Sequence, residues 1–305
     1  MTRFLLRRVA EAVGALFGIM ILIFALLHLY HGSPAAAILG KQVTPQRIAH
    51  LNAQMGLNRP VPIQFLLWMK AALWNGALVG VLTRLLPPTV ELLGLGVLVA
   101  VLLAVVAATV QVHHSRSLLD RAIGVILNTL SAIPGFWLGS LLVFVFAVTY
   151  PILPASGVAV MHHGLITWFR HEIMPVTTLS LSVVGPWARH LRASLDEAGT
   201  ADYVRTARAK GVAEFNLVRH HTFKNSLLPL ITIIGMSLPT MLNTVIALEI
   251  IFAIRGLGVA LIVSLNGLFF ALATTVSLAL ALVTVLGSLC ADVAYGLVDP
   301  RIQYR

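Results

Sequence analysis

Long apolar segments alternate with short polar ones along the chain. Stretches without Asp, Glu, Lys or Arg occupy 12–27, 92–112, 122–169, 173–188, 225–248 and 256–291. A helix needs about 20 apolar residues to cross a hydrocarbon core of about 30 Å. The pattern therefore predicts six transmembrane helices, near 9–30, 89–112, 121–148, 173–194, 225–253 and 269–297. Pro151, Pro154 and Gly157 predict that the long third stretch ends in a loop.

Two segments between the predicted spans are polar enough to lie outside the membrane. Residues 31–88 contain six prolines and predict a long loop, with a short amphipathic helix near Gln64–Trp74. Residues 195–224 predict a second loop, which carries much of the charge between spans. The expected organisation is a single transmembrane domain over residues 1–305.

Composition excludes the soluble alternatives. The 305 residues are 58% hydrophobic and 10% charged, with a mean hydropathy of +0.92, whereas soluble domains carry about 25% charged residues. One compact core could not hide this much apolar surface, and disordered chains are poor in apolar residues. The single cysteine, Cys290, cannot form an internal disulfide. We therefore expect an all-α polytopic membrane protein.

The net charge of +10 is best explained by membrane topology rather than by nucleic-acid binding. With a cytoplasmic N-terminus, 14 of the 21 Lys and Arg residues fall in inside segments, seven of them between Arg189 and Lys224. The positive-inside rule then predicts that both termini are cytoplasmic. The alternative is that the first span is a signal peptide, with a cleavage site near Ala35–Ala37. Its apolar stretch is longer than the usual 7–15 residues, which favours a retained helix.

The inside loop contains a short helical pattern. At 100° per residue, Tyr203, Val204, Ala207 and Gly211 fall on one narrow face. Asp202 and Arg205 lie on the other side, three residues apart, where they can pair. Such an amphipathic helix fits a groove on a partner protein. The alternative is a basic connector that lies at the lipid headgroups.

Motifs along nearly the whole chain resemble the permeases of the peptide/nickel family of ABC importers. They are Leu86–Leu92, Ile133–Gly139, Arg189–Leu195, Asp202–Gly211, Asn225–Pro229, Glu249 with Phe252, Gly256, Leu257 and Gly258, then Asp292, and finally Val298–Ile302. The order of these motifs is the family order. The resemblance implies the type I ABC importer permease fold, in the bacterial cytoplasmic membrane.

The resemblance also implies partners and a mechanism. The cytoplasmic loop would form a coupling helix that docks on an ATPase subunit, with the contact residues Asp202, Tyr203, Val204, Arg205, Ala207, Arg208, Lys210 and Gly211. The chain would pair with a homologous permease, two ATP-binding subunits and an extracytoplasmic binding protein. ATP and Mg²⁺ would bind to the partners, and import would proceed by alternating access. Di- or oligopeptides are the first expected cargo; nickel or another metal chelate is the alternative.

Some segments depart from the family pattern. Arg205, Thr206 and Ala207 stand where the general permease signature has a glutamate and two alanines, as is usual in the peptide/nickel branch. Residues 75–85 are shorter than usual, Ile254–Arg255 replaces a Trp-Pro pair, and residues 267–270 are apolar. The last three departures face outside and imply an altered contact with the binding protein.

Glu249 is the most informative charge within a predicted span. An ionisable side chain in a membrane helix costs a few kcal/mol and usually faces a cavity or a partner. We therefore consider Glu249, with Phe252, Gly256 and Gly258, as a candidate gate or pathway lining. The equal alternative is that Glu249 extends to the outer surface near Arg255.

Enzymatic motifs are absent from the sequence. Gly40–Lys41 is followed by Gln42 and lacks the upstream glycine of a nucleotide-binding loop. The adjacent histidine pairs, such as His162–His163, have poor spacing for chelation on a helix, so no metal site is predicted. A secondary transporter or a polytopic enzyme is the remaining alternative, although no inverted repeat supports the former.

Overall fold

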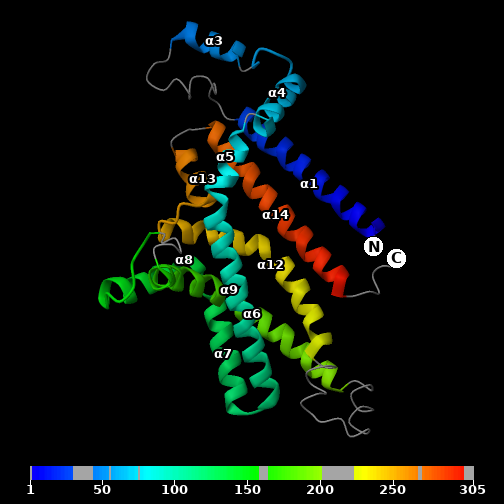
Figure 1. The fold of residues 1–305 in the computed structure, drawn as a ribbon, viewed down its shortest axis with the longest axis vertical. Coiled ribbons are helices and arrows are strands. Elements are labelled where there is room, and N and C mark those ends of the chain that lie inside the picture. The colour runs from blue at the N-terminus through cyan, green and yellow to red at the C-terminus, as the bar shows by residue number, and fades with distance from the viewer. Residues whose placement is uncertain are drawn as a thin grey trace. The chain divides into compact units, whose positions relative to one another are not determined.

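The computed structural model describes residues 2–29, 44–54, 56–74, 76–157, 164–200, 223–266 and 270–298, and these form helices without a strand (Figure 1). The elements are α1 (Thr2–Leu29), α3 (Pro45–Gln54), α4 (Val61–Trp74), α5 (Ala77–Arg84), α6 (Leu86–His113), α7 (Leu118–Ala132), α8 (Gly135–Val143), the π-helix η2 (Phe144–Thr149), α9 (Leu165–Thr200), α12 (Phe223–Ile251), α13 (Leu257–Asn266) and α14 (Phe270–Val298). The predicted all-α class is confirmed.

By length and composition, four helical segments can cross a membrane: Leu6–Leu26, Leu86–His113, Pro229–Ile251 and Leu272–Val293. They lie in α1, α6, α12 and α14 and match four of the predicted spans. Two bent helix pairs raise the number to six if each pair counts as one span. These pairs are Val61–Trp74 with Ala77–Arg84, and Leu118–Ala132 with Gly135–Thr149.

The predicted span 173–194 lies within α9, but α9 is not one of these apolar helices. It carries charged residues toward both ends and includes Pro175 and Pro186. Its middle is buried by other helices: Leu179, Val184 and Trp187 have no exposed surface. A helix surrounded by protein needs less apolar surface than one that faces lipid. A criterion based on apolar composition alone therefore does not select α9 as a membrane span.

The prediction of one continuous helix over 121–148 was wrong. α7 and the segment formed by α8 and η2 meet at an angle of 96°. Ile133, at the break, has an extended backbone with φ −74° and ψ 130°. The following Pro134 explains this conformation, because the proline ring disfavours the α-helical region at the preceding residue. The predicted loop does follow, after Thr149.

Much of the predicted outside loop 31–88 is helical in its described part. The helix expected near Gln64–Trp74 is α4, and α3 and α5 are additional helices. The loop prediction failed here because apolar side chains of α4 have packing partners distant in sequence. Phe65 of α4 packs against Phe24 of α1 with ring centroids 5.3 Å apart. Pro45 and Pro60 lie at or next to the starts of α3 and α4 and so mark helix boundaries rather than an absence of structure.

The chain divides into two compact units. The larger is built mainly on Glu91–Ile254, and the smaller on Leu6–Val90 with Arg255–Leu286. In the larger unit, α9 packs against α7, α8 and α12. Ala100, Ala104 and Ala108 on α6 are fully buried, and such small residues allow membrane helices to approach closely. In the smaller unit, Met20, Leu78, Val81 and Val276 belong to a separate apolar core.

Candidate functional site

The predicted coupling residues lie outside the described residues. These are Asp202, Tyr203, Val204, Arg205, Ala207, Arg208, Lys210 and Gly211. The described chain reaches Thr200, the last residue of α9, and resumes at Phe223, the first residue of α12. The structural context of the coupling loop is therefore given by the ends of these two helices.

Glu249 lies in the last turn of α12 and has no exposed surface. Its carboxylate is therefore enclosed by this chain. Just beyond the end of α12, Ala253 adopts φ 51°, and Ile254 N–H donates to the Glu249 carbonyl at 2.8 Å. This left-handed residue with a backward hydrogen bond is a common way to end a helix.

Phe252 packs where α8 comes close to the end of α12. A Cβ at Gly139 would lie 3.1 Å from Leu248 Cδ2 and 3.4 Å from Phe252 Cε2, so a glycine at this position permits the approach. The Phe252 carbonyl accepts a hydrogen bond from Gly157 N–H at 2.9 Å. Gly256 and Gly258 belong to the smaller unit, at the start of α13, and are buried there.

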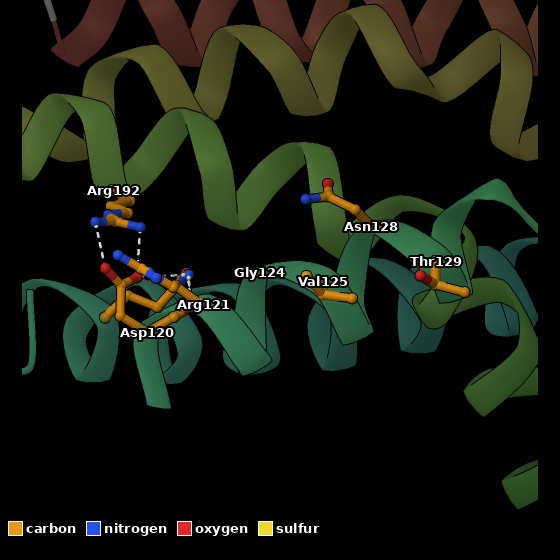
Figure 2. A pocket seen from close by; sticks show the side chains of 8 residues that line it. Asp120, Arg121, Gly124, Val125, Asn128, Thr129 and Arg192 are labelled. Carbon is orange, nitrogen blue, oxygen red and sulfur yellow. Dashed lines mark hydrogen bonds and ion pairs between the residues drawn. The ribbon is translucent and has the colours of Figure 1, made fainter. Parts of the chain in front are cut away.

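A pocket of about 610 Å³ lies where α7 meets the C-terminal part of α9 (Figure 2). It is lined by Gln111, Asp120, Arg121, Gly124, Val125, Asn128, Thr129 and Arg192. Gln111 comes from the end of α6, Arg192 from α9, and the others from α7. The pocket thus lies beside the helix that precedes the predicted coupling loop.

Asp120 is the central residue of this site, with only 4% of its surface exposed. Its carboxylate accepts hydrogen bonds from both terminal nitrogens of Arg192, with the Nη2–Oδ2 distance at 2.8 Å. Arg116 N–H donates to Oδ2 at 3.0 Å, and Gln111 Nε2 donates to Oδ1 at 3.2 Å. A two-pronged Arg–carboxylate pair of this kind fixes orientation as well as distance.

Local sequence explains how Asp120 is positioned. Ser117 is the N-cap of α7, and its Oγ accepts a hydrogen bond from the Asp120 amide at 3.2 Å. An acidic side chain in the first turn also interacts favourably with the helix dipole. Asp120 therefore satisfies the start of its own helix and binds α9 with the same side chain.

The two hydrogen bonds from the Arg192 guanidinium require the Asp120 side chain to be in its ionised, carboxylate form.

A second arginine links the same two helices one turn earlier on α9. Arg189 Nη1 donates to Asn128 Oδ1 of α7. Arg192 also approaches Asp196, at 3.7 Å, within α9. Within the described residues, no group of three or more His, Cys, Asp or Glu side chains could hold a metal ion. The arrangement is suited to holding helices in place rather than to bond chemistry.

Sequence reasoning missed this site. Asp120 and Arg192 are far apart in the chain, and although Arg192 lies in the Arg189–Leu195 motif, nothing in the sequence pairs it with Asp120. The available signal was Ser117 followed three residues later by Asp120, which resembles a helix N-cap. Sequence reasoning also missed Trp168, whose Nε1–H donates to Glu91 Oε1 at 2.6 Å and joins α9 to α6.

The fold and this site define an all-helical membrane protein whose central helix is fixed by polar side chains and leads into a charged loop. Two family models match the chain. The model of the binding-protein-dependent transport system inner membrane component matches residues 96–304, and the model of the N-terminal part of such membrane components matches residues 1–84. The chain therefore belongs to this family of membrane components of binding-protein-dependent transport systems.

Individual relatives agree over their full length. A probable peptide ABC transporter permease of Sinorhizobium fredii is 33% identical, with 99% of both chains covered. A dipeptide transport system permease of Alkalihalophilus pseudofirmus is 29% identical, with 100% of both chains covered. The predicted ABC permease family and its fold are thus confirmed. The chain is a multi-pass inner-membrane subunit, and its family implies ATP-hydrolysing and substrate-binding partners.

Proposed function

We propose that this chain forms one half of the transmembrane channel of an ATP-driven importer of di- or oligopeptides. The observation that carries this proposal is the full-length similarity to permeases named for peptide and dipeptide transport. Nickel or another metal chelate is less favoured as cargo, because these relatives are named for peptides. The whole chain would act as one permease domain.

The complete machine in this proposal contains a second homologous permease, two ATP-binding subunits and an extracytoplasmic binding protein. ATP and Mg²⁺ bind to the ATP-binding subunits, where hydrolysis takes place. The permease alternates between inward and outward access, and the binding protein selects the cargo. Both termini lie in the cytoplasm, a topology supported by the excess of Lys and Arg in the inside segments.

The coupling helix over 202–211 is the contact with the ATPase in this proposal. Arg205, Arg208 and Lys210 give it positive charge, while Tyr203 and Val204 begin its narrow apolar face. Glu249, Phe252, Gly256 and Gly258 form the candidate gate or pathway. The burial of Glu249 and Phe252 supports this role, because an interior acid is costly and is usually kept for function.

The test is a purified complex of this chain with the ATP-binding subunits, second permease and binding protein expressed from the same organism. We expect ATP-dependent uptake of a labelled dipeptide into proteoliposomes. The double variant Arg205→Glu/Arg208→Glu should lose the ATPase subunits on purification and lose uptake. Arg47→Glu, at an exposed position of α3, is the charge-reversal control and should retain both.

Two results would contradict the proposal. A complex that purifies without any ATP-binding chain would remove the assignment to an ATP-driven importer. Uptake of a nickel chelate but of no di- or oligopeptide would overturn the cargo while preserving the class of transporter.

A further inference from the structure

The hydroxyl of Ser131, at the end of α7, forms hydrogen bonds with two backbone groups of α9. Gly185 N–H donates to Ser131 Oγ at 2.9 Å, and Ser131 Oγ donates to the Leu181 carbonyl at 2.9 Å. These two backbone groups are four residues apart and are normal partners in an α-helix. A side chain of another helix therefore bridges one step of the α9 hydrogen-bond ladder.

The next residue of α9 weakens the ladder further. Pro186 has no N–H and cannot pair with the Ser182 carbonyl. Bends in long helices occur at prolines and where a side chain enters the ladder, and residues 181–186 combine both features. The absence of a side chain at Gly185 allows the α7 backbone to come close to α9. A Cβ at position 185 would lie only 2.6 Å from the Leu127 carbonyl oxygen.

The parts of α9 on either side of this point have polar bonds to different helices. The N-terminal part binds α6, through Trp168 to Glu91 and through Ser180 Oγ to the Gly96 carbonyl at 3.0 Å. The C-terminal part binds α7, through Arg189 to Asn128 and Arg192 to Asp120. The only polar link from Asp120 back to α6 in the described residues is to Gln111, in the last turns of that helix.

The α7 helix has its own break at the same level. Ser131 is the penultimate residue of α7, and the 96° bend to α8 follows at Ile133–Pro134. Trp187 Nε1 binds Ser237 Oγ of α12 at 3.1 Å, next to the same point on α9. Contacts near a pivot move least, so this bond to α12 does not oppose rotation about it.

We propose that α7 and the part of α9 over residues 187–200 move as one block, about a pivot formed by Ser131, Gly185 and Pro186. Ser131 is a positioning residue that keeps α9 deformable, since its hydroxyl satisfies the Leu181 and Gly185 groups when they separate. The inference rests on the proposed function, because the coupling loop that follows α9 supplies the motion. In this proposal, α7 transmits the motion of the coupling loop into the membrane.

Spin labels on the full transporter complex can test the pivot. Cys290→Ser removes the native cysteine, and cysteines at the exposed Phe169 and Ala193 place labels on the two parts of α9. Along an unbent helix these positions lie about 36 Å apart, within reach of pulsed electron resonance. The reference pair, Val125 and Ala193, lies within the proposed block.

Adding a non-hydrolysable ATP analogue should change the Phe169–Ala193 distance and leave the Val125–Ala193 distance unchanged. Ser131→Ala lets Leu181 and Gly185 pair directly, so it should abolish the distance change and lower dipeptide uptake several-fold without loss of the ATPase subunits. Ser131→Thr keeps the hydroxyl and should restore both. Ser140→Ala is the matched control, because the Ser140 hydroxyl binds only within α8, at the Phe136 carbonyl.

An unchanged Phe169–Ala193 distance in a complex that transports peptide would overturn the pivot and leave the proposed function intact. So would a Val125–Ala193 distance that changes with the nucleotide, or wild-type behaviour of Ser131→Ala. If the wild-type complex shows no ATP-dependent transport, the proposed function fails and the pivot fails with it.

Discussion

The two units of this protein hold their helices together in different ways. In the larger unit, directional polar bonds join α9 to its neighbours: Asp120 to Arg192, and Ser131 to the α9 backbone. In the smaller unit, aromatic rings pack α1 against α4, with Phe65 between Phe17 and Phe24 at centroid distances of 5.8 and 5.3 Å. Apolar packing tolerates changes of shape, whereas a hydrogen bond in an apolar medium depends on its exact partner.

The difference has a functional meaning. A helix that transmits a motion must keep its register against the next helix, and polar bonds at fixed positions provide that register. The aromatic contacts of the smaller unit fill space without fixing one arrangement so strictly. We therefore expect changes of single polar atoms to matter around α9 in the larger unit, and changes of volume to matter at the contact of α1 with α4 in the smaller one.

Removing the Asp120 carboxylate should have the largest effect. Asp120→Ala leaves the Arg192 guanidinium without its main partner, so the purified protein should unfold at a markedly lower temperature in detergent. Breaking a buried ion pair on one side costs more than the pair contributes, because the remaining charge is uncompensated. Arg192→Met should restore part of the loss in the Asp120→Ala background. Equal unfolding temperatures for the wild type and Asp120→Ala would contradict the central role of this pair.

Gly185→Ala should have the next largest effect. The added Cβ would meet the Leu127 carbonyl oxygen at 2.6 Å, and a backbone atom cannot easily move away. We expect a destabilisation of about 2 kcal/mol in the free energy of unfolding, typical of overpacking, measured by titration with denaturing detergent. Gly94→Ala is the control, since a Cβ at Gly94 meets nothing within 4 Å and should not destabilise.

Phe65→Leu tests the tolerance of the smaller unit. The substitution keeps an apolar side chain of similar volume but removes the edge-to-face contacts with Phe17 and Phe24. We expect a loss of about 1 kcal/mol in the free energy of unfolding, with peptide uptake preserved. Phe65→Ala removes volume as well and should cost more. An effect of Phe65→Leu as large as that of Gly185→Ala would erase the contrast between the two units.

The sequence predicted well what depends on composition and local pattern. Apolar stretches of sufficient length predicted both ends of α6, α12 and α14 to within three residues, since the membrane imposes the length. For α1 they predicted only the C-terminal end, because its first turns are charged and precede the apolar stretch. The sequence-based prediction failed where contacts between residues distant in the chain determine the local structure. The 96° break at Pro134 could not be distinguished from a mild kink, and the helices α3 to α5 depend on packing that no local window contains.

The residues of the candidate site also fall into those that the sequence identified and those that only the fold brings together. Glu249 could be singled out because a charged residue within an apolar stretch can be recognised from the sequence alone. In the structure its side chain is fully buried. The Asp120–Arg192 pair could not, because neither residue is unusual where it stands and only the fold brings them together. Ser131 is harder still, since serines are common in membrane helices and its significance comes from the two backbone atoms it meets.

The smallest predicted effect concerns a residue that contributes to neither kind of packing. Ala253 is exposed and has φ 51°, a left-handed conformation that costs a non-glycine residue about 1 kcal/mol. Ala253→Gly should therefore raise the free energy of unfolding by about 0.5 kcal/mol, because glycine adopts this conformation without a steric penalty. Ala193→Gly, at an exposed position inside α9, should change stability in the opposite direction by about 1 kcal/mol. If both substitutions destabilise the protein, the end of α12 is held by the methyl group of Ala253 rather than strained by it.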